Sequence, residues 1–328
     1  MLGIGLIIVL CLILAAEFIN GWTDSPNSIA TVVSTRVLTP KTAVIMATIC
    51  NTIGAFFGAE VAKTIGTGIV KPEAINLITV GAAMVGIVVW SIIAWYFGLP
   101  TSESHALVAG LAGAGLATAG PSVLLWSGWV KVLTGLVFST ILGFFGGWFI
   151  AWLIRKLCVR MSRHVGQKLF SWLQIISAGA MALSHGSNDG QKFIGMFTLA
   201  LVLGGAIPEF HVHPLTIVIC SLIMGLGTST GGWKIIKTMG QKMVKIEPYQ
   251  GFAAQTSAAG SILLASSLGV PLSTTHTINT SLMGVSAANR ISSIRWPVVG
   301  ELVTAWILTF PICGLIGYLM ALLFQFIF

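Results

Sequence analysis

Charged residues are scarce in this chain: they make up 8% of the sequence, and only nine residues are acidic. Soluble globular domains carry roughly 25% charged residues, so this scarcity excludes a water-soluble globular protein. Hydrophobic residues reach 55%, which predicts an integral membrane protein. The formal net charge of +8 is then better explained by membrane topology than by nucleic-acid binding.

Pairs of neighbouring cysteines are also missing. The five cysteines stand singly, mostly in apolar runs: Cys11, Cys50, Cys158, Cys220 and Cys313. This spacing argues against disulfides and metal centres. Neither half of the chain contains a Gly-x-Ser-x-Gly elbow or a His-Glu-x-x-His zinc pair, so the chain is not expected to be an enzyme or to hold a cofactor.

A basic leader before the first apolar run is absent, so residues 2–19 are expected to form a retained helix and not a signal peptide. Further apolar runs of near-spanning length lie at 43–62, 76–97, 128–154, 214–227, 252–268 and 298–328. Shorter runs at 105–119, 171–183, 193–207 and 276–288 predict discontinuous or re-entrant helices. We expect an all-α polytopic membrane protein with about ten membrane segments.

Two kinds of polar phrase interrupt the apolar sequence, and each kind occurs once in each half. The first kind contains Asp24 or Asp189, and the second is a proline and hydroxyl run that ends at His105 or His276. The halves are predicted to be residues 1–154 and 171–328, joined by a basic connection at 155–170. They form an inverted-topology repeat within one intertwined membrane domain.

Basic residues are concentrated in the connections at 155–168, 234–245 and 290–295. The positive-inside rule places these connections in the cytoplasm. Both termini are then extracytoplasmic, and the second half runs in the opposite direction to the first. We expect a multi-pass protein of the plasma membrane.

The polar phrases are typical of an anion site at the middle of a membrane. Helices that begin near His105 and His276 would direct their free N–H groups at an anion. Ser25 and Pro26 are likewise expected to cap and begin a helix. Hydroxyls that can contact a tetrahedral oxyanion are Thr101, Ser102, Ser104, Ser273, Thr274 and Thr275.

Asp24 and Asp189 require a bound cation or a proton when an anion lies beside them, which is the physical basis of symport. Lys192, one helical turn after Asp189, can pair with Asp189 or with the substrate. Glu103 is a candidate proton carrier, because a carboxyl group that leaves water favours its protonated form. It can equally be a carboxylate at the wet mouth of a cavity.

Three histidines lie in or beside the polar phrases. We expect His105, His185 and His276 to orient loops by hydrogen bonding and not to bind a metal. The reason is that no second ligand is recognised at i+3 or i+4 from any of them.

Both halves resemble the inorganic phosphate transporter (PiT) family, whose signatures are similar to Gly-Ala-Asn-Asp and Pro-Val-Ser-Thr-Thr-His. The resemblance implies that Asn27 and Asn188 belong to the substrate or coupling-ion site with Asp24 and Asp189. It also implies a homodimer that moves phosphate with protons or sodium. Thr23, Glu103 and Lys192 depart from the family pattern. The fixed ammonium of Lys192 should repel a second cation, so we expect proton coupling.

Among oxyanions, protonated phosphate can donate hydrogen bonds to Asp24, Glu103 and Asp189, whereas sulfate at neutral pH cannot. Phosphate is therefore the expected substrate, and arsenate should be handled alike. A sulfate permease of the same family is the main alternative, because Lys192 would suit a permanent dianion. A metal–phosphate complex as the substrate and an anion channel are further alternatives.

Overall fold

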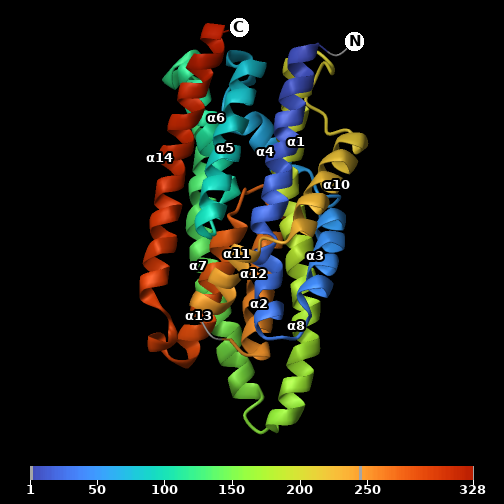
Figure 1. The fold of residues 1–328 in the computed structure, drawn as a ribbon, viewed down its shortest axis with the longest axis vertical. Helices are drawn as coiled ribbons and strands as arrows, with labels where there is room; N and C mark the ends of the chain where they lie inside the picture. Colours follow the sequence, from blue (N-terminus) through green and yellow to red (C-terminus); the bar gives the residue numbers. More distant parts are fainter. Residues whose placement is uncertain (1–2, 244–245, 328) are drawn as a thin grey trace.

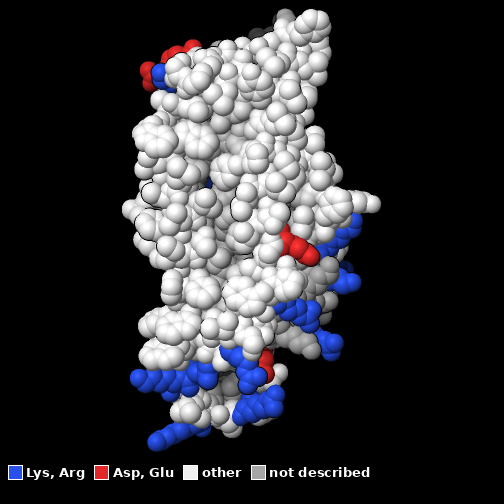
Figure 2. Space-filling view, turned by 90° about the vertical axis from the view of Figure 1, so that its left-hand side faces the viewer, with Lys and Arg blue, Asp and Glu red and all other residues white. Residues whose placement is uncertain are grey.

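The computed structural model describes residues 3–243 and 246–327, which form a long helical bundle (Figure 1). Lys245 of the predicted basic connection lies outside these residues. Both ends of the described chain lie at one end of the bundle, and the connection between α7 and α8 lies at the other. Lysines and arginines gather at that second end (Figure 2). The basic connection at 155–170 and the termini therefore lie at opposite ends of the bundle.

The helices of the N-terminal part are α1 (Ile4–Asp24), α2 (Pro26–Ser34), α3 (Pro40–Gly54), α4 (Glu60–Gly68), α5 (Leu77–Phe97), α6 (Glu103–Ala119) and α7 (Trp126–Leu157), with short 3-10 turns η1 (Pro72–Ala74) and η2 (Pro121–Val123). The C-terminal part contains α8 (Arg163–His185), the π-helical turn η3 (Gly186–Gly190), α9 (Gln191–Leu203), α10 (Pro214–Thr230), α11 (Trp233–Lys237), η4 (Thr238–Met243), α12 (Pro248–Ser267), α13 (Thr274–Asn289), η5 (Ile291–Ser293) and α14 (Trp296–Ile327).

Four helical stretches in the described ranges are long and apolar enough to cross a membrane. They are Ile4–Ser34, Leu77–Phe97, Trp126–Leu157 and Trp296–Ile327. Backbone polar groups have no water to bind inside a bilayer, so an uninterrupted helix is the conformation that long apolar runs adopt there. The sequence prediction of an all-helical protein is confirmed.

The two parts of the chain repeat one order of elements. The series α5, α6, η2 and α7 has 21, 17, 3 and 32 residues. The series α12, α13, η5 and α14 has 20, 16, 3 and 32 residues. In Figure 1, α7 runs toward the basic end and α14 runs away from it. Corresponding helices therefore differ by at most one residue in length, and α7 and α14 run in opposite directions.

The corresponding hairpins exchange partners. The α6 helix packs along α14, and α13 packs along α7. Glycines permit these close approaches: a Cβ on Gly113 would collide with the backbone of Gly314, and one on Gly284 with the backbone of Phe144. Such small-residue contacts let helices pack closely in membranes. The long helix of each part thus supports the hairpin of the other part.

The apolar run at 43–62 is not one helix, contrary to the sequence expectation. It breaks after Gly54, and α4 starts at Glu60. Side chains of the second signature occupy the break: Gln191 Nε2 donates to Phe57 O at 2.5 Å, and Gln191 Oε1 accepts from Val61 N at 3.1 Å. A distant glutamine therefore replaces the backbone hydrogen bonds that a continuous helix would make.

The runs at 171–183 and 193–207 also differ from the prediction, because they belong to one continuous path. The α8 helix passes through the five-residue π turn η3 into α9 without leaving helical geometry. A π turn widens a helix locally and is frequent at functional sites. In this chain it contains Asn188 and Asp189.

Candidate functional site

Two hairpin tips meet inside the bundle and bring the two hydroxyl phrases together. Gly98 and Gly269 adopt φ of +70° and +64° before the tips, a conformation that glycine reaches without a Cβ clash. Ser102 caps α6 by accepting from His105 N at 3.3 Å, and Ser273 caps α13 by accepting from His276 N at 3.2 Å. The rings of His105 and His276 are 4.7 Å apart. The two helices begin near His105 and His276, as predicted.

The first aspartate contacts the second hairpin tip. Thr275 Oγ1 donates to Asp24 Oδ1 at 3.2 Å and accepts from Asn27 Nδ2 at 3.0 Å. These residues come from α1, α2 and α13, and Asp24 and Thr275 are 251 positions apart in the chain. The N-terminal signature is thus completed by a hydroxyl from the C-terminal part.

The second aspartate contacts the same tip. Thr274 Oγ1 donates to Asp189 Oδ2 at 2.8 Å. Adjacent threonines on α13 therefore each bind one of the two carboxylates, which draws Asp24 and Asp189 to the same place. The sequence expectation of one shared polar site agrees with this geometry.

His185 lies between the two carboxylates, a position that the sequence reading missed. Its Nε2 is 3.1 Å from Asp189 Oδ2 and 3.8 Å from Asp24 Oδ2. Its Nδ1 is 3.1 Å from Asn51 Oδ1. The expectation that no ligand stands at i+4 was wrong, since Asp189 is the fourth residue after His185. That spacing was the available signal. Ligand atoms of Asp24, His185 and Asp189 all lie within 4.8 Å of one another, close enough to share a metal ion.

The other two histidines do not orient loops by hydrogen bonding as predicted. In the described parts of the chain, neither ring nitrogen of His276 has a hydrogen-bond partner, and Nδ1 of His105 has none either. Their rings pack on aromatic groups instead: His276 lies 3.8 Å from the Trp306 ring and His105 lies 4.8 Å from the Phe310 ring. Both tips thus rest on α14.

Lys192 points into the same site and is 1% exposed. Its Nζ contacts Asp189 Oδ1 and Ser104 Oγ, and it donates to Leu272 O at 2.8 Å. Of the two partners that the sequence left open, the structure shows Asp189. The ammonium is surrounded by a carboxylate, a hydroxyl and a backbone carbonyl, which all accept hydrogen bonds.

Glu103 and Asn188 lie at the edge of this group. Glu103 Oε1 accepts from Thr23 Oγ1 at 3.0 Å, and Oε2 accepts from Ser91 Oγ at 2.6 Å. At 2% exposure, Glu103 is enclosed and not at a wet cavity mouth. Asn188 Nδ2 donates to Ser266 Oγ at 2.8 Å. The remaining predicted hydroxyl, Thr101, is buried at the first tip.

Two helix N-termini converge on the site, and the expected cap at Ser25 is not formed. Ser25 stays in helical geometry and makes no side-chain cap; its Oγ donates back to Trp22 O at 3.2 Å. Pro26 does occupy the first position of α2 as predicted. Since α1 continues into α2 and α8 into α9, the free N–H groups come from α6 and α13.

The enclosed group can act chemically as a joint anion and cation site. Hydroxyls and helix N-termini donate to an oxyanion. The two buried carboxylates can bind a coupling cation or a proton, and the histidine and the ammonium can carry positive charge. This balances the charge of the anion, as burial in a membrane demands. Asp24, Asp189 and Lys192 are each at most 3% exposed, so neither face of the protein opens onto the site in this conformation.

Comparison with solved structures identifies a protein of the same fold. A solved structure of "the sodium-dependent phosphate transporter" has the same fold, with a TM-score of 0.84 over 99% of this chain and 100% of that chain. Its sequence identity is 22%, so the likeness concerns the fold alone.

Sequence relatives are closer. A probable low-affinity inorganic phosphate transporter of Rhizobium meliloti (strain 1021) is 43% identical, covering 92% of this chain and 91% of the relative. One of Bacillus subtilis (strain 168) is 38% identical, covering 98% of each. The model of the phosphate transporter family matches residues 20–317. This chain therefore belongs to the phosphate transporter family and is a membrane protein.

Proposed function

We propose that this protein imports inorganic phosphate into the cell by symport with a cation, and that the cation is the proton. The observation that carries the proposal is the enclosed cage in which Thr274 and Thr275 bind both aspartates. We assign substrate binding to Asp24, Asn27, Thr101, Ser102, Ser104, Asp189, Lys192, Ser273, Thr274 and Thr275. We assign the coupling ion to Asp24, Asn27, Glu103, Asn188 and Asp189.

Phosphate suits this cage because it can both accept and donate hydrogen bonds at neutral pH. Its hydroxyl group can donate to a carboxylate such as Asp24, while its other oxygens accept from the threonines. Sulfate lacks the proton for that bond. Lys192 already pairs with Asp189, which leaves it less available to a permanent dianion. Arsenate shares the shape and protonation of phosphate and is expected to be transported as well.

Enclosure supports a carrier over a channel. A channel needs a continuous pore, whereas alternating access to a closed site lets each cycle move substrate and coupling ion together. The element order and the opposed directions of α7 and α14 (Figure 1) support two inverted halves, at 1–154 and 171–328. The basic residues at one end of the bundle support a cytoplasmic location for the 155–170 connection. We assign the protein itself to the plasma membrane. A homodimer stays a prediction from the family resemblance.

Lys192 supports the proton as coupling ion. Its ammonium occupies an oxygen-rich position beside Asp189 (Asp189 Oδ1, Ser104 Oγ and Leu272 O) where a sodium ion would otherwise find ligands. A second cation placed there would be repelled by the fixed charge. Glu103, which accepts two hydroxyl hydrogen bonds, is the candidate group that binds and releases the proton.

The test is uptake of labelled phosphate by proteoliposomes, with pH and sodium gradients imposed separately. We expect concentrative uptake when the vesicle exterior is acidic, and no requirement for sodium. Unlabelled arsenate should compete and sulfate should not. Uptake that only equilibrates phosphate would indicate a channel, and competition by sulfate alone would indicate a sulfate permease. An absolute sodium requirement without pH dependence would contradict proton coupling.

Replacing Lys192 tests the coupling argument directly. Lys192→Asn removes the ammonium and leaves an amide oxygen for a cation, so sodium should stimulate uptake at least about threefold in the variant and not in the natural protein. Lys131→Asn, which removes an outward-facing lysine of α7, is the matched control and should leave the sodium response unchanged. Absence of sodium stimulation in a folded Lys192→Asn protein would contradict the assignment.

A further inference from the structure

A cleft of about 600 Å³ lies at the basic end of the bundle, and in the described part of the chain it shares no lining residue with the transport site. It is formed where α7 ends, the chain turns, α8 begins and α12 starts. Residues that matter for its chemistry are Trp152, Arg155, Lys156, Arg163, Phe170 and Tyr249. None of them belongs to the cage between the hairpin tips.

The lining of this cleft is strongly basic. Arg155, Lys156 and Arg163 line it, and they face a single acidic residue, Glu247. That carboxylate is engaged in the capping box of α12 with Gln250. The cleft therefore presents a net positive wall to an anion.

Two of the basic side chains are held in place over the cleft. Arg155 Nη1 donates to Ala288 O at the end of α13, at 2.5 Å. Lys156 Nζ lies 5.1 Å from the centre of the Trp152 ring, within reach of its π face. Positioned cations lose less conformational entropy when an anion binds.

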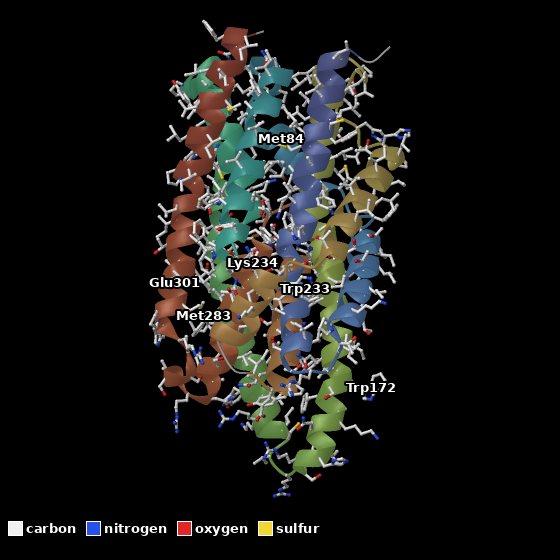
Figure 3. The ribbon with its side chains drawn as sticks, viewed as in Figure 1. Met84, Trp172, Trp233, Lys234, Met283 and Glu301 are labelled. Carbon is white, nitrogen blue, oxygen red and sulfur yellow. The ribbon has the colours of Figure 1, made fainter. Side chains whose placement is uncertain are left out.

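Apolar and aromatic side chains also line the cleft. Trp152, Ile154 and Phe170 line it. Trp148 and Trp152 stack at 6.4 Å on the outer side of α7. On α8, Trp172 is 63% exposed and points outward near the basic end (Figure 3). Outward-facing tryptophans mark the level of lipid headgroups, so the cleft opens where headgroups and acyl chains meet.

We propose that this cleft binds one anionic phospholipid of the leaflet at the basic end. Its phosphate-bearing headgroup contacts the basic side chains of Arg155, Lys156 and Arg163. The part of an acyl chain nearest the headgroup contacts Trp152, Ile154 and Phe170. Free inorganic phosphate shares the headgroup chemistry, but it has no acyl chain that could contact the apolar side chains of the cleft. Basic pockets between membrane helices are suited to such headgroups.

The experiment uses the full-length protein in detergent micelles, with native mass spectrometry of added phosphatidylglycerol or phosphatidylcholine. We expect one phosphatidylglycerol to be retained at concentrations at which phosphatidylcholine is not. The triple variant Arg155→Gln, Lys156→Gln, Arg163→Gln should weaken retention roughly a hundredfold, because each basic side chain contributes about fivefold. The double variant Arg155→Lys, Arg163→Lys keeps the charge and should retain the lipid.

A control at the opposite end is Lys63→Gln with Lys71→Gln, which removes charge without touching the cleft. It should bind phosphatidylglycerol like the natural protein. Equal retention of both lipids, or unchanged retention by the Gln variant, would overturn the proposal. Displacement of phosphatidylglycerol by millimolar free phosphate would also overturn it, and would assign the cleft to the soluble anion. Thermal unfolding of each variant in the same detergent shows whether it is folded.

Discussion

At the scale of single residues, the hydroxyl of Thr275 links the two parts of the chain. It accepts from Asn27 and donates to Asp24, so its loss would leave a buried carboxylate and a buried amide without this partner. Unsatisfied buried groups of this kind cost about 1–3 kcal/mol. This one hydroxyl therefore satisfies two buried polar groups of the site.

Thr275→Val keeps the shape of the side chain and removes the hydroxyl. We expect phosphate uptake to fall at least about tenfold, with the larger part of the loss in substrate affinity. Thr277→Val is the matched control, since Thr277 lies on the same helix, is equally buried, and donates only to Ser273 O of its own turn. Initial rates of labelled phosphate uptake measure both variants; similar losses in the two would contradict the assignment.

Glu103 gives a second prediction at this scale. Glu103→Gln cannot bind a proton, so uptake should lose its stimulation by an imposed pH gradient while phosphate binding survives. Glu301→Gln is the control, because Glu301 lies on the outer side of α14 (Figure 3) and is exposed. Uptake is followed with the exterior pH lowered stepwise. Persistent pH stimulation in Glu103→Gln would show that another group carries the proton.

At the scale of elements, the two hairpin tips are held by matching braces from the opposite part of the chain. Thr64 of α4 donates to Gly269 O at 2.8 Å, and Thr238 of η4 donates to Gly98 O at 2.8 Å. Each glycine has a positive φ. The sequence analysis placed the start of α4 in the apolar run at 43–62 and η4 in the basic connection at 234–245. In the structure, both elements position the hairpin tips that line the site.

Gly269→Ala tests this brace. A residue with a Cβ in this conformation costs about 1–2 kcal/mol, and the added Cβ would lie 3.3 Å from Glu60 Cβ. We expect a lower unfolding temperature in detergent and reduced uptake. Gly260→Ala in α12 is the control: nothing lies within 4 Å of its added Cβ, and alanine favours helix by about 1 kcal/mol. An unchanged unfolding temperature in Gly269→Ala would refute the role of the brace.

The sequence predicted the hairpins because their signals are local: a proline, a hydroxyl cap and a glycine turn within about ten residues. It missed the break after Gly54 because the partner of that break is Gln191, far away in the chain. His185 was missed although its spacing to Asp189 was visible, since a continuous π turn through Asn188 was not anticipated. Contacts between distant segments cannot be read from local patterns.

At the scale of the whole molecule, charge is distributed unevenly along the bundle. Lysines and arginines gather at the end opposite the termini (Figures 1 and 2). The 32 residues of α7 run between the two ends, and at about 1.5 Å per residue this length exceeds the hydrocarbon thickness of a bilayer. The two ends of α7 should therefore lie on opposite sides of the membrane.

Single cysteines in a cysteine-free background test this orientation. Ser122→Cys in η2 precedes α7, and Arg160→Cys follows it; both positions are exposed. In intact cells, a membrane-impermeant thiol reagent should label Ser122→Cys and should label Arg160→Cys only after permeabilisation. The opposite pattern would reverse the orientation, and labelling of both from outside would exclude a transmembrane α7.

The exchange of partners between hairpins has a consequence for synthesis. When synthesis has reached only α7, the glycine face of α6 is not yet covered by α14. At that stage Asp24 also lacks the hydrogen bond that Thr275 donates. Because each hairpin waits for a helix of the other part, the ion cage forms only after the last helices have left the ribosome. An unfinished chain therefore cannot yet bind both ions together.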